Sequence, residues 1–294
     1  MLVCAAGLAG QADGAAARAS GAAWFPPSGY FSSPLADLRE PRLGAGLIVT
    51  DVFAAPGAER PRFQLAGPAD ASPDVQGVVG LGALVRVWRP VARPEGGVVV
   101  GFQAGVHSRF RLEQPSRDNV GTDWMAALPV EAAWGRLSGR LRLVHRSAHL
   151  GDELQQGSGA RRIEYSHEAV DALLAWRPGR ALRVYAGGAF IFRSLTELLP
   201  ALAGRGDDAA VQAGLEAAWP ADARGRLMLL AAADWQRAER TGWNDELSAA
   251  AGLGAALGGR TFRLLLRHYR GPSTMGEFFL TRESFWGLEL TAEP

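Results

Sequence analysis

The stretch Leu137-Ser-Gly-Arg-Leu-Arg-Leu-Val-His-Arg-Ser-Ala-His149 alternates between two kinds of side chain along its length. Leu141 and Leu143 share one parity, and Arg140 and Arg142 share the other. Because successive side chains of a β-strand point to opposite faces, one face of this strand is apolar and the other carries guanidinium groups. This pattern is typical of transmembrane β-barrels, which turn apolar side chains toward lipid and polar ones toward the lumen.

Alternating segments of this kind fill the chain from Arg42 to its end, and the links between them are alternately short and long. Outer-membrane barrels have short periplasmic turns, long extracellular loops and an even number of strands. We therefore expect an all-β, up-and-down transmembrane β-barrel of about twelve antiparallel strands, with both chain termini in the periplasm. A soluble β-sandwich is the alternative, because its strands alternate as well. The expected strands lie near residues 42–53, 76–88, 98–112, 122–134, 137–149, 162–176, 181–193, 209–219, 226–237, 245–257, 261–270 and 282–292.

The fourth expected strand has the right length to cross a membrane. Trp124 and Trp134 mark the two ends of its apolar face. Ten residues at roughly 3.3 Å each, tilted by about 40°, rise about 25 Å, which is the height of a lipid-facing band. The opposite parity of the strands is crowded with charge, and we expect these groups to pair across strands in a lumen filled by side chains and water. They are Arg109, Arg111, Arg140, Arg142, Arg183, Arg263, Arg267, Glu131, Glu164, Glu216, Asp234 and Glu289.

Composition excludes several other classes of protein. Hydrophobic residues make up 48% of the 294 residues, yet we find no run of about eighteen apolar residues, so a transmembrane helix is not expected. A net charge of +1 gives no argument for a nucleic-acid partner. Cys4 is the single cysteine, so the chain forms no internal disulfide.

The N-terminal residues differ in composition from the rest of the chain. Residues 1–20 contain an apolar stretch followed by small residues, which indicates a secretory signal peptide. The usual basic residues before the apolar stretch are lacking, which fits a truncated start, and a disordered Ala/Gly tail is the alternative. Residues 21–41 are rich in Pro and Ser, and we expect an extended segment on the periplasmic side that leads into a barrel of residues 42–294.

Several stretches resemble an uncharacterised domain-of-unknown-function family of Gram-negative bacterial proteins. They are Phe25-Pro-Pro27, Pro34-Leu-Ala-Asp-Leu-Arg-Glu-Pro41, Leu141-Arg-Leu-Val-His-Arg-Ser-Ala-His-Leu-Gly-Asp-Glu153, Val211-Gln-Ala-Gly-Leu-Glu216 and Gly276-Glu-Phe-Phe279. The resemblance implies a bacterial outer-membrane barrel without an assigned activity, inserted by the barrel-assembly machinery. Such barrels usually end in an aromatic residue, whereas here Thr-Ala-Glu-Pro follows Leu290.

His145 and Ser147 form the one pair with evident chemistry. Residues two apart on a strand point the same way, so the imidazole can take a proton from the serine hydroxyl and make it a nucleophile. Their parity puts both on the lipid side, near the outer rim, where they would meet the ester region of outer-leaflet lipids. The pair resembles the His-x-Ser pair on the outer face of a strand in outer-membrane phospholipase A and the lipid A deacylases. In those families Asn commonly follows the serine, whereas this chain has Ala148.

The same resemblance implies a third catalytic residue, an Asn or Glu on the neighbouring strand. We expect Tyr165 opposite His145, with Glu164 facing inward. Asp152 or Glu153 could curl back from the loop to orient the imidazole instead. Calcium at the rim is a cofactor of some of these enzymes and is implied here by the resemblance alone.

Three functions remain open on sequence grounds. One is a lipid acyl-ester hydrolase acting on outer-membrane lipids or lipopolysaccharide. The second is a non-catalytic barrel that passes a small solute or anchors a surface assembly. The third is a metal site formed by His145, His149, Asp152 and Glu153. Of the other histidines, we expect His107 to face the lumen, and His167 and His268 to face outward.

Overall fold

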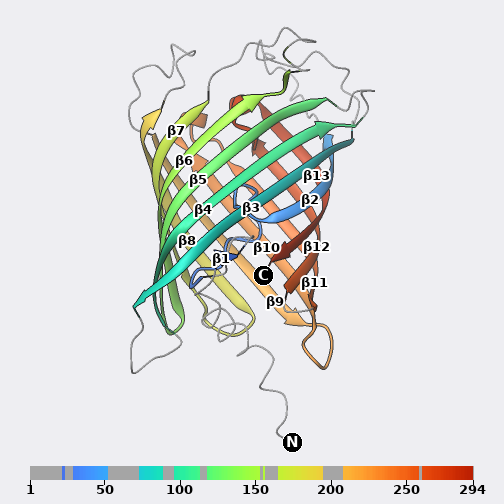
Figure 1. Cartoon of the computed structure of the whole chain (residues 1–294). Coiled ribbons are helices and arrows are strands. Elements are labelled where there is room, and N and C mark those ends of the chain that lie inside the picture. The colour runs from blue at the N-terminus through green and yellow to red at the C-terminus, as the bar shows by residue number, and fades with distance from the viewer. Residues whose placement is uncertain are drawn as a thin grey trace, which may run out of the picture.

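The computed structural model describes residues 22–23, 29–51, 73–88, 96–112, 118–152, 155, 165–194, 208–257 and 260–293. Antiparallel strands β2 to β13 each pair with their chain neighbours, and β2 pairs with β13 to close a twelve-stranded barrel (Figure 1). The barrel strands are β2 (Leu43–Asp51), β3 (Pro73–Trp88), β4 (Gly97–Arg111), β5 (Asn119–Trp134), β6 (Leu137–Leu150), β7 (Ser166–Trp176), β8 (Leu182–Ser194), β9 (Asp208–Pro220), β10 (Leu227–Ala238), β11 (Glu246–Leu257), β12 (Arg260–Pro272) and β13 (Arg282–Glu293).

This architecture confirms the all-β, up-and-down barrel and excludes the β-sandwich. Three further short elements are β1 (Ala22–Ala23), which pairs with β3, and the 3-10 helices η1 (Glu239–Thr241) and η2 (Gly276–Phe278). The described residues include no helix long and apolar enough to cross a membrane. Tight turns such as Gly135–Arg136, between β5 and β6, lie at the lower end of the barrel in Figure 1. We call the opposite end the upper end.

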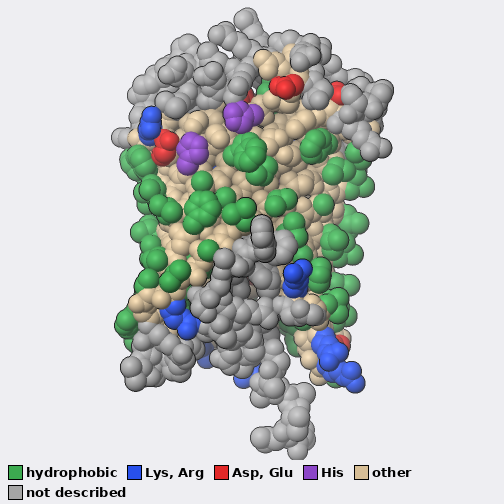
Figure 2. All heavy atoms as spheres, in the orientation of Figure 1, with side chains coloured by type: hydrophobic (Ala, Val, Ile, Leu, Met, Phe, Trp, Pro, Cys, Tyr) green, Lys and Arg blue, Asp and Glu red, His purple; other side chains and the backbone are tan. Residues whose placement is uncertain are grey.

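The outer wall of the barrel is apolar, as Figure 2 shows by its green side chains. On β5, Trp124 and Trp134 are exposed at the upper and lower ends of the strand, and Leu128 between them is 55% exposed. Trp134 stacks on Trp88 of β3 at a centroid distance of 6.3 Å. An apolar wall between tryptophan-bearing ends is the surface that a bilayer covers.

This surface predicts a depth-dependent response to charge. Leu128→Arg places a guanidinium near the middle of the apolar wall, and we expect it to lower the free energy of unfolding by about 2–4 kcal/mol. Leu137→Arg, at the lower end of β6, is expected to cost no more than about 1 kcal/mol because the side chain reaches the interface. Both variants are refolded into phospholipid vesicles and unfolded with guanidinium chloride. Equal losses at the two depths would contradict a bilayer around this wall.

The inner wall carries paired charges, as the alternation predicts. Arg183 of β8 contacts Glu216 of β9 at 2.8 Å. Arg267 of β12 contacts Glu289 of β13 at 2.6 Å. All of these side chains are at least four-fifths buried inside the barrel, so ion pairs occupy this part of the lumen.

Residues 29–42, which we call the lumen segment, run through the interior of the barrel (Figure 1). Glu40 is 1% exposed and accepts hydrogen bonds from Arg140 at 2.6 and 2.8 Å and from Arg142 at 3.0 and 3.4 Å. The Phe31 ring lies between two guanidinium groups, with Arg140 at 4.9 Å and Arg183 at 4.7 Å from its centroid. Both ends of the segment are therefore fixed to the inner wall by cationic side chains.

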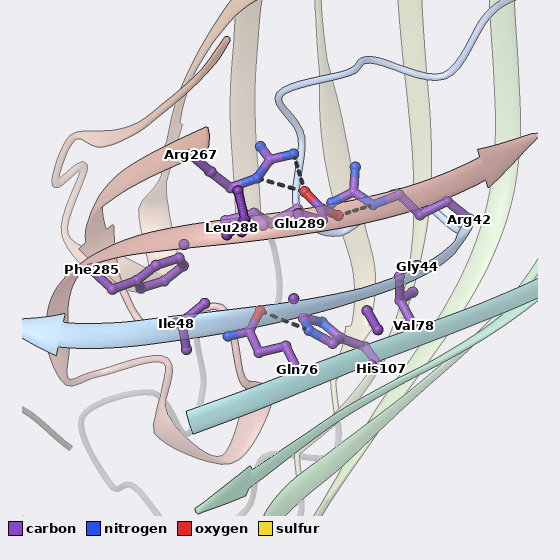
Figure 3. A pocket seen from close by; sticks show the side chains of 15 residues that line it. Arg42, Gly44, Ile48, Gln76, Val78, His107, Arg267, Phe285, Leu288 and Glu289 are labelled. Carbon is purple, nitrogen blue, oxygen red and sulfur yellow. Dashed lines mark hydrogen bonds and ion pairs between the residues drawn. The ribbon is translucent and has the colours of Figure 1, made fainter. Parts of the chain in front are cut away.

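The middle and the end of the lumen segment are bound to the opposite side of the wall. Arg267 donates to the backbone carbonyls of Leu35, at 3.0 Å, and Ala36, at 2.9 Å. Arg42 and Arg267 bind the two oxygens of Glu289 from opposite sides (Figure 3). Donors from the wall thus satisfy a stretch of chain that makes few backbone hydrogen bonds of its own.

The location of this segment differs from the expectation for residues 21–41. For residues 21–41 we expect an extended segment on the periplasmic side, whereas Gly29 to Pro41 lie as irregular chain inside the lumen. A local pattern does not show which barrel arginines the segment will meet, because those partners are about 100 to 230 positions away in the chain. Residues 1–20 lie outside the described residues, so the signal peptide stays a prediction.

Candidate active site

The outer face of β6 carries His145 and Ser147 near its upper end. The alternating exposure along the strand puts both side chains on the outward face that Leu141 and Leu143 share. Ser147 pairs with Trp124 of β5, so it lies level with the upper tryptophan of the wall. Residues two apart are separated by about 6.6–6.8 Å along a strand, a gap that an imidazole and a hydroxyl group can bridge.

Glu168 of β7 lies directly opposite His145 in the strand register. Its Oε1 atom is 3.2 Å from Nδ1 of His145, and the two side chains are 23% and 46% exposed. An ionised carboxylate only accepts hydrogen bonds, so Nδ1 carries the proton in this contact. The tautomer that results leaves Nε2 of His145 as the atom able to take a proton from a neighbouring hydroxyl.

Arg193 of β8 extends this row of outward side chains to a third strand. It pairs with Glu168 in the register, and its Nε lies 3.8 Å from the second carboxylate oxygen, Oε2. Within the part of the chain that the structure describes, Oε2 is buried and makes no hydrogen bond. Figure 2 shows histidine, acidic and basic side chains close together on this face, above the apolar wall.

The residue opposite His145 is Glu168, whereas the sequence pattern predicts Tyr165 there. Tyr165 comes one residue before β7, and its carbonyl oxygen accepts from the backbone N–H of Ala148, so the position opposite His145 belongs to Glu168. The register is fixed at the lower end, where Leu137 pairs with Trp176, and not by the long link between the strands. Asp152 is exposed just past the end of β6. Glu153 and Glu164 lie outside the described residues.

The other histidines follow two of the three expectations. His107 faces the lumen next to Gln76, at 3.3 Å (Figure 3), and His268 faces outward against Trp286 at a ring distance of 4.6 Å. The expectation for His167 is wrong, because it is buried inside and lies 3.2 Å from Arg240. A shift of one residue in the expected strand turns every side chain to the opposite face. Because Glu168 faces outward, the adjacent His167 must face inward.

The side chains at the rim do not form a recognisable metal site. Among the described residues no group of three or more His, Cys, Asp or Glu side chains could hold a metal ion. His149 is exposed on the same face as His145, and the Glu168 carboxylate on this face is bound to the imidazole of His145. Calcium prefers several oxygen ligands, and the described residues do not supply that set. Calcium therefore stays a prediction.

The row of Ser147, His145 and Glu168 has the order of a nucleophile, a base and a group that orients the base. What makes it unusual is its surroundings, since a hydrogen-bonded carboxylate and imidazole face outward from an apolar wall. Buried or lipid-facing ionisable groups are costly unless they are paired, and such groups mark functional sites more often than chance would give.

The fold defines the class of protein to which the chain belongs. The barrel has the fold of outer-membrane β-barrels. It is similar to outer membrane phospholipase A from Escherichia coli, at 13% identity and a TM-score of 0.56, over 86% of this chain and 90% of that one. It is also similar to the calcium-bound dimer of the Salmonella typhi outer membrane phospholipase, at 13% identity and a TM-score of 0.54, over 86% and 91%.

The family follows from the sequence itself. Residues 73–293 match the profile described as "Protein of unknown function (DUF1207)". The match covers most of the chain, so the protein belongs to the DUF1207 family, and the resemblance found in its sequence motifs is confirmed. No curated protein matches the chain in sequence.

Proposed function

We propose that this protein is an outer-membrane enzyme that hydrolyses acyl esters of outer-leaflet lipids. The observation that carries the proposal is the contact between Glu168 and His145, two residues before Ser147 on an outward strand face. A carboxylate, an imidazole and a hydroxyl group in this order are needed to activate a serine. The fold similarity to outer membrane phospholipase A supports this fold as a scaffold for such a site.

The steps follow from the geometry of the three residues. Ser147 Oγ attacks the ester carbonyl carbon while Nε2 of His145 takes the hydroxyl proton, and Glu168 stabilises the imidazolium through Nδ1. The C–O bond then breaks, and His145 returns the proton to the leaving alcohol, which leaves an acyl-serine. A water molecule attacks this acyl group with His145 again as base, which releases the fatty acid and restores Ser147.

The position of the site fits its proposed substrate. Ser147 lies level with Trp124, and tryptophans of outer-membrane barrels mark the interface where lipid headgroups begin. The ester bonds of a lipid lie just inside that interface, so the substrate can reach Ser147 by lateral movement within the membrane without entering the lumen.

The lumen segment argues against the alternative of an open solute channel. Residues 29–42 are bound inside the barrel by side chains from β5, β6, β8, β9, β12 and β13. A channel needs a continuous water-filled lumen, and this segment occupies the space that such a path would use.

The proposal is tested with protein refolded in detergent and given phospholipid or lipopolysaccharide. Fatty-acid release is measured with added calcium and with a chelator. We expect release from at least one of the two lipids, and the chelator arm shows whether calcium contributes. No release from folded barrel under either condition would overturn the hydrolase proposal.

Glu168→Ala is expected to lower kcat by about 100- to 1,000-fold, because the imidazole loses the group that fixes its tautomer and stabilises its charge. Glu168→Gln is expected to retain more activity, since its amide oxygen can still accept from Nδ1. Asp245→Ala is the matched control, because Asp245 is a carboxylate bound to Arg237 in a loop outside this row. Full activity in Glu168→Ala would exclude Glu168 from the mechanism.

A further inference from the structure

A β-bulge in β8 turns one arginine toward the membrane. The pairing of β7 with β8 shifts between Glu168 and Ala169, so that Glu168 pairs with Arg193 and Ala169 pairs with Ile191. Phe192 is the extra residue. Ile191 is buried on the inner side, and regular alternation would send Arg193 to the same side. Because of the bulge, Arg193 instead joins Glu168 on the outer face, and bulges commonly re-aim a side chain beside a functional site.

An outward-facing charge is unfavourable in this apolar wall, so its presence points to a functional role. A lipid-facing arginine is strongly destabilising at mid-membrane and nearly neutral near the interface. Arg193 is the penultimate residue of β8, at the upper end, where the cost is small. The neighbouring outward residues Phe190 and Phe192 are exposed and apolar. The guanidinium of Arg193 therefore lies next to an apolar surface that lipid acyl chains can contact.

The guanidinium of Arg193 has N–H donors that its contact with Glu168 does not use. Its side chain is 62% exposed, and its contact with Glu168 is an ion pair of 3.8 Å through Nε. In the described ranges it makes no hydrogen bond. A planar guanidinium binds phosphate through two parallel N–H donors. The two terminal nitrogens are available for such a contact while Nε remains near Glu168.

From these observations we infer that Arg193 binds the phosphate of the lipid whose ester bond Ser147 attacks; this inference rests on the proposed function. Strands lie about 4.8 Å apart, so β8 is about 10 Å from β6, a distance that the long arginine side chain largely spans. In a phosphate-bearing lipid the phosphate and the ester are a few bonds apart. Arg193 is thus a specificity residue that selects phosphorylated lipids and presents their esters to Ser147.

The test separates lipid binding from hydrolysis. Binding of a fluorescent phospholipid and of the matching diacylglycerol is measured with Ser147→Ala protein in detergent, which prevents turnover. We expect Arg193→Ala to weaken phospholipid binding about 5- to 10-fold and to leave diacylglycerol binding unchanged, with Arg193→Lys in between. Arg270→Ala, an exposed arginine near the upper end of β12, is the matched control and is expected to change neither.

Hydrolysis gives the second readout. With Ser147 intact, Arg193→Ala is expected to raise KM for phospholipid by the same factor and to affect turnover of a neutral p-nitrophenyl ester much less. Equal losses on both substrates, or unchanged phospholipid binding, would overturn the inference. Competition by inorganic phosphate as effective as that of the lipid would assign the arginine to a free anion and overturn it as well. If the protein with Ser147 hydrolyses neither lipid, the proposed function fails, while the binding comparison still decides the role of Arg193.

Discussion

Ser147→Ala is expected to reduce fatty-acid release by about 1,000-fold or more, to the level of a control without protein. The covalent intermediate requires the Oγ atom, and in serine hydrolases the loss of the nucleophile removes most of the catalysis in a single change. The side chain is half-buried at the end of a regular strand, and alanine fits a strand without strain. We therefore expect the variant to fold as the parent protein does.

The matched control is Ser166→Ala. Ser166 lies directly opposite Ser147 in the register of β6 and β7, on the same outward face, and it does not follow a histidine by two positions. Its replacement is expected to leave release within about two-fold of the parent. Folding of both variants is checked by resistance to proteolysis. Retention of activity by Ser147→Ala would mean that another group performs the chemistry and would contradict the proposed nucleophile.

Glu40→Ala is expected to lower the free energy of unfolding by about 3–5 kcal/mol, because it leaves buried arginines without their carboxylate. Arg140 and Arg142 both bind Glu40, and each is at most 4% exposed at its side chain. Arg142 keeps a contact with Asp171 at 2.9 Å, whereas Arg140 has its ion pair with Glu40. The loss of this anchor is also expected to release the lumen segment and raise the ion conductance of the barrel in a planar bilayer.

Unfolding of vesicle-embedded protein by guanidinium chloride gives the stability, and bilayer recordings give the conductance. Glu40→Gln keeps the volume and part of the hydrogen bonding and is expected to show a smaller effect on both. Glu239→Ala, in helix η1, which contains no buried residue, is the control for loss of a carboxylate. A parent barrel that conducts as freely as Glu40→Ala would show that the segment does not close the lumen.

Most of the barrel could be predicted from the sequence, because strand alternation is a local property. Each expected strand lies within four residues of the observed one at both ends. The faces of β5 and β6 also follow from the pattern, because one parity carries large apolar residues such as Leu128 and Leu141 while the charged residues such as Glu131 fall on the other. The inward arginines of β6 are correctly placed for the same reason.

The candidate site could be predicted only in part. His145 and Ser147 lie two apart on one strand, so their common face follows from local geometry. Glu168 is on another strand, and its position opposite His145 depends on a register that the intervening link does not encode. Its outward carboxylate also contradicts the rule that charge faces the lumen. Departures from such rules are expected at functional sites, where stability is sacrificed for chemistry.

The lumen segment could not be predicted because its partners are distant. The sequence around Glu40 shows a short polar stretch, and nothing local indicates that Arg140 and Arg142 will surround it. The bulge at Phe192 could not be predicted either. In the sequence pattern, an extra residue in β8 looks the same as the end of the strand.

The attachment of the lumen segment to β2 has a consequence for the order of assembly. Arg42 immediately precedes β2, and it binds Glu289 of β13, the strand that β2 must meet to close the barrel. Contacts between the segment and β12 span as many as 232 positions. The earliest residues of the barrel domain therefore obtain their partners only when the last strands are in place. We expect seam closure and seating of the segment to occur as one late event, slow because its contacts are so distant in the chain.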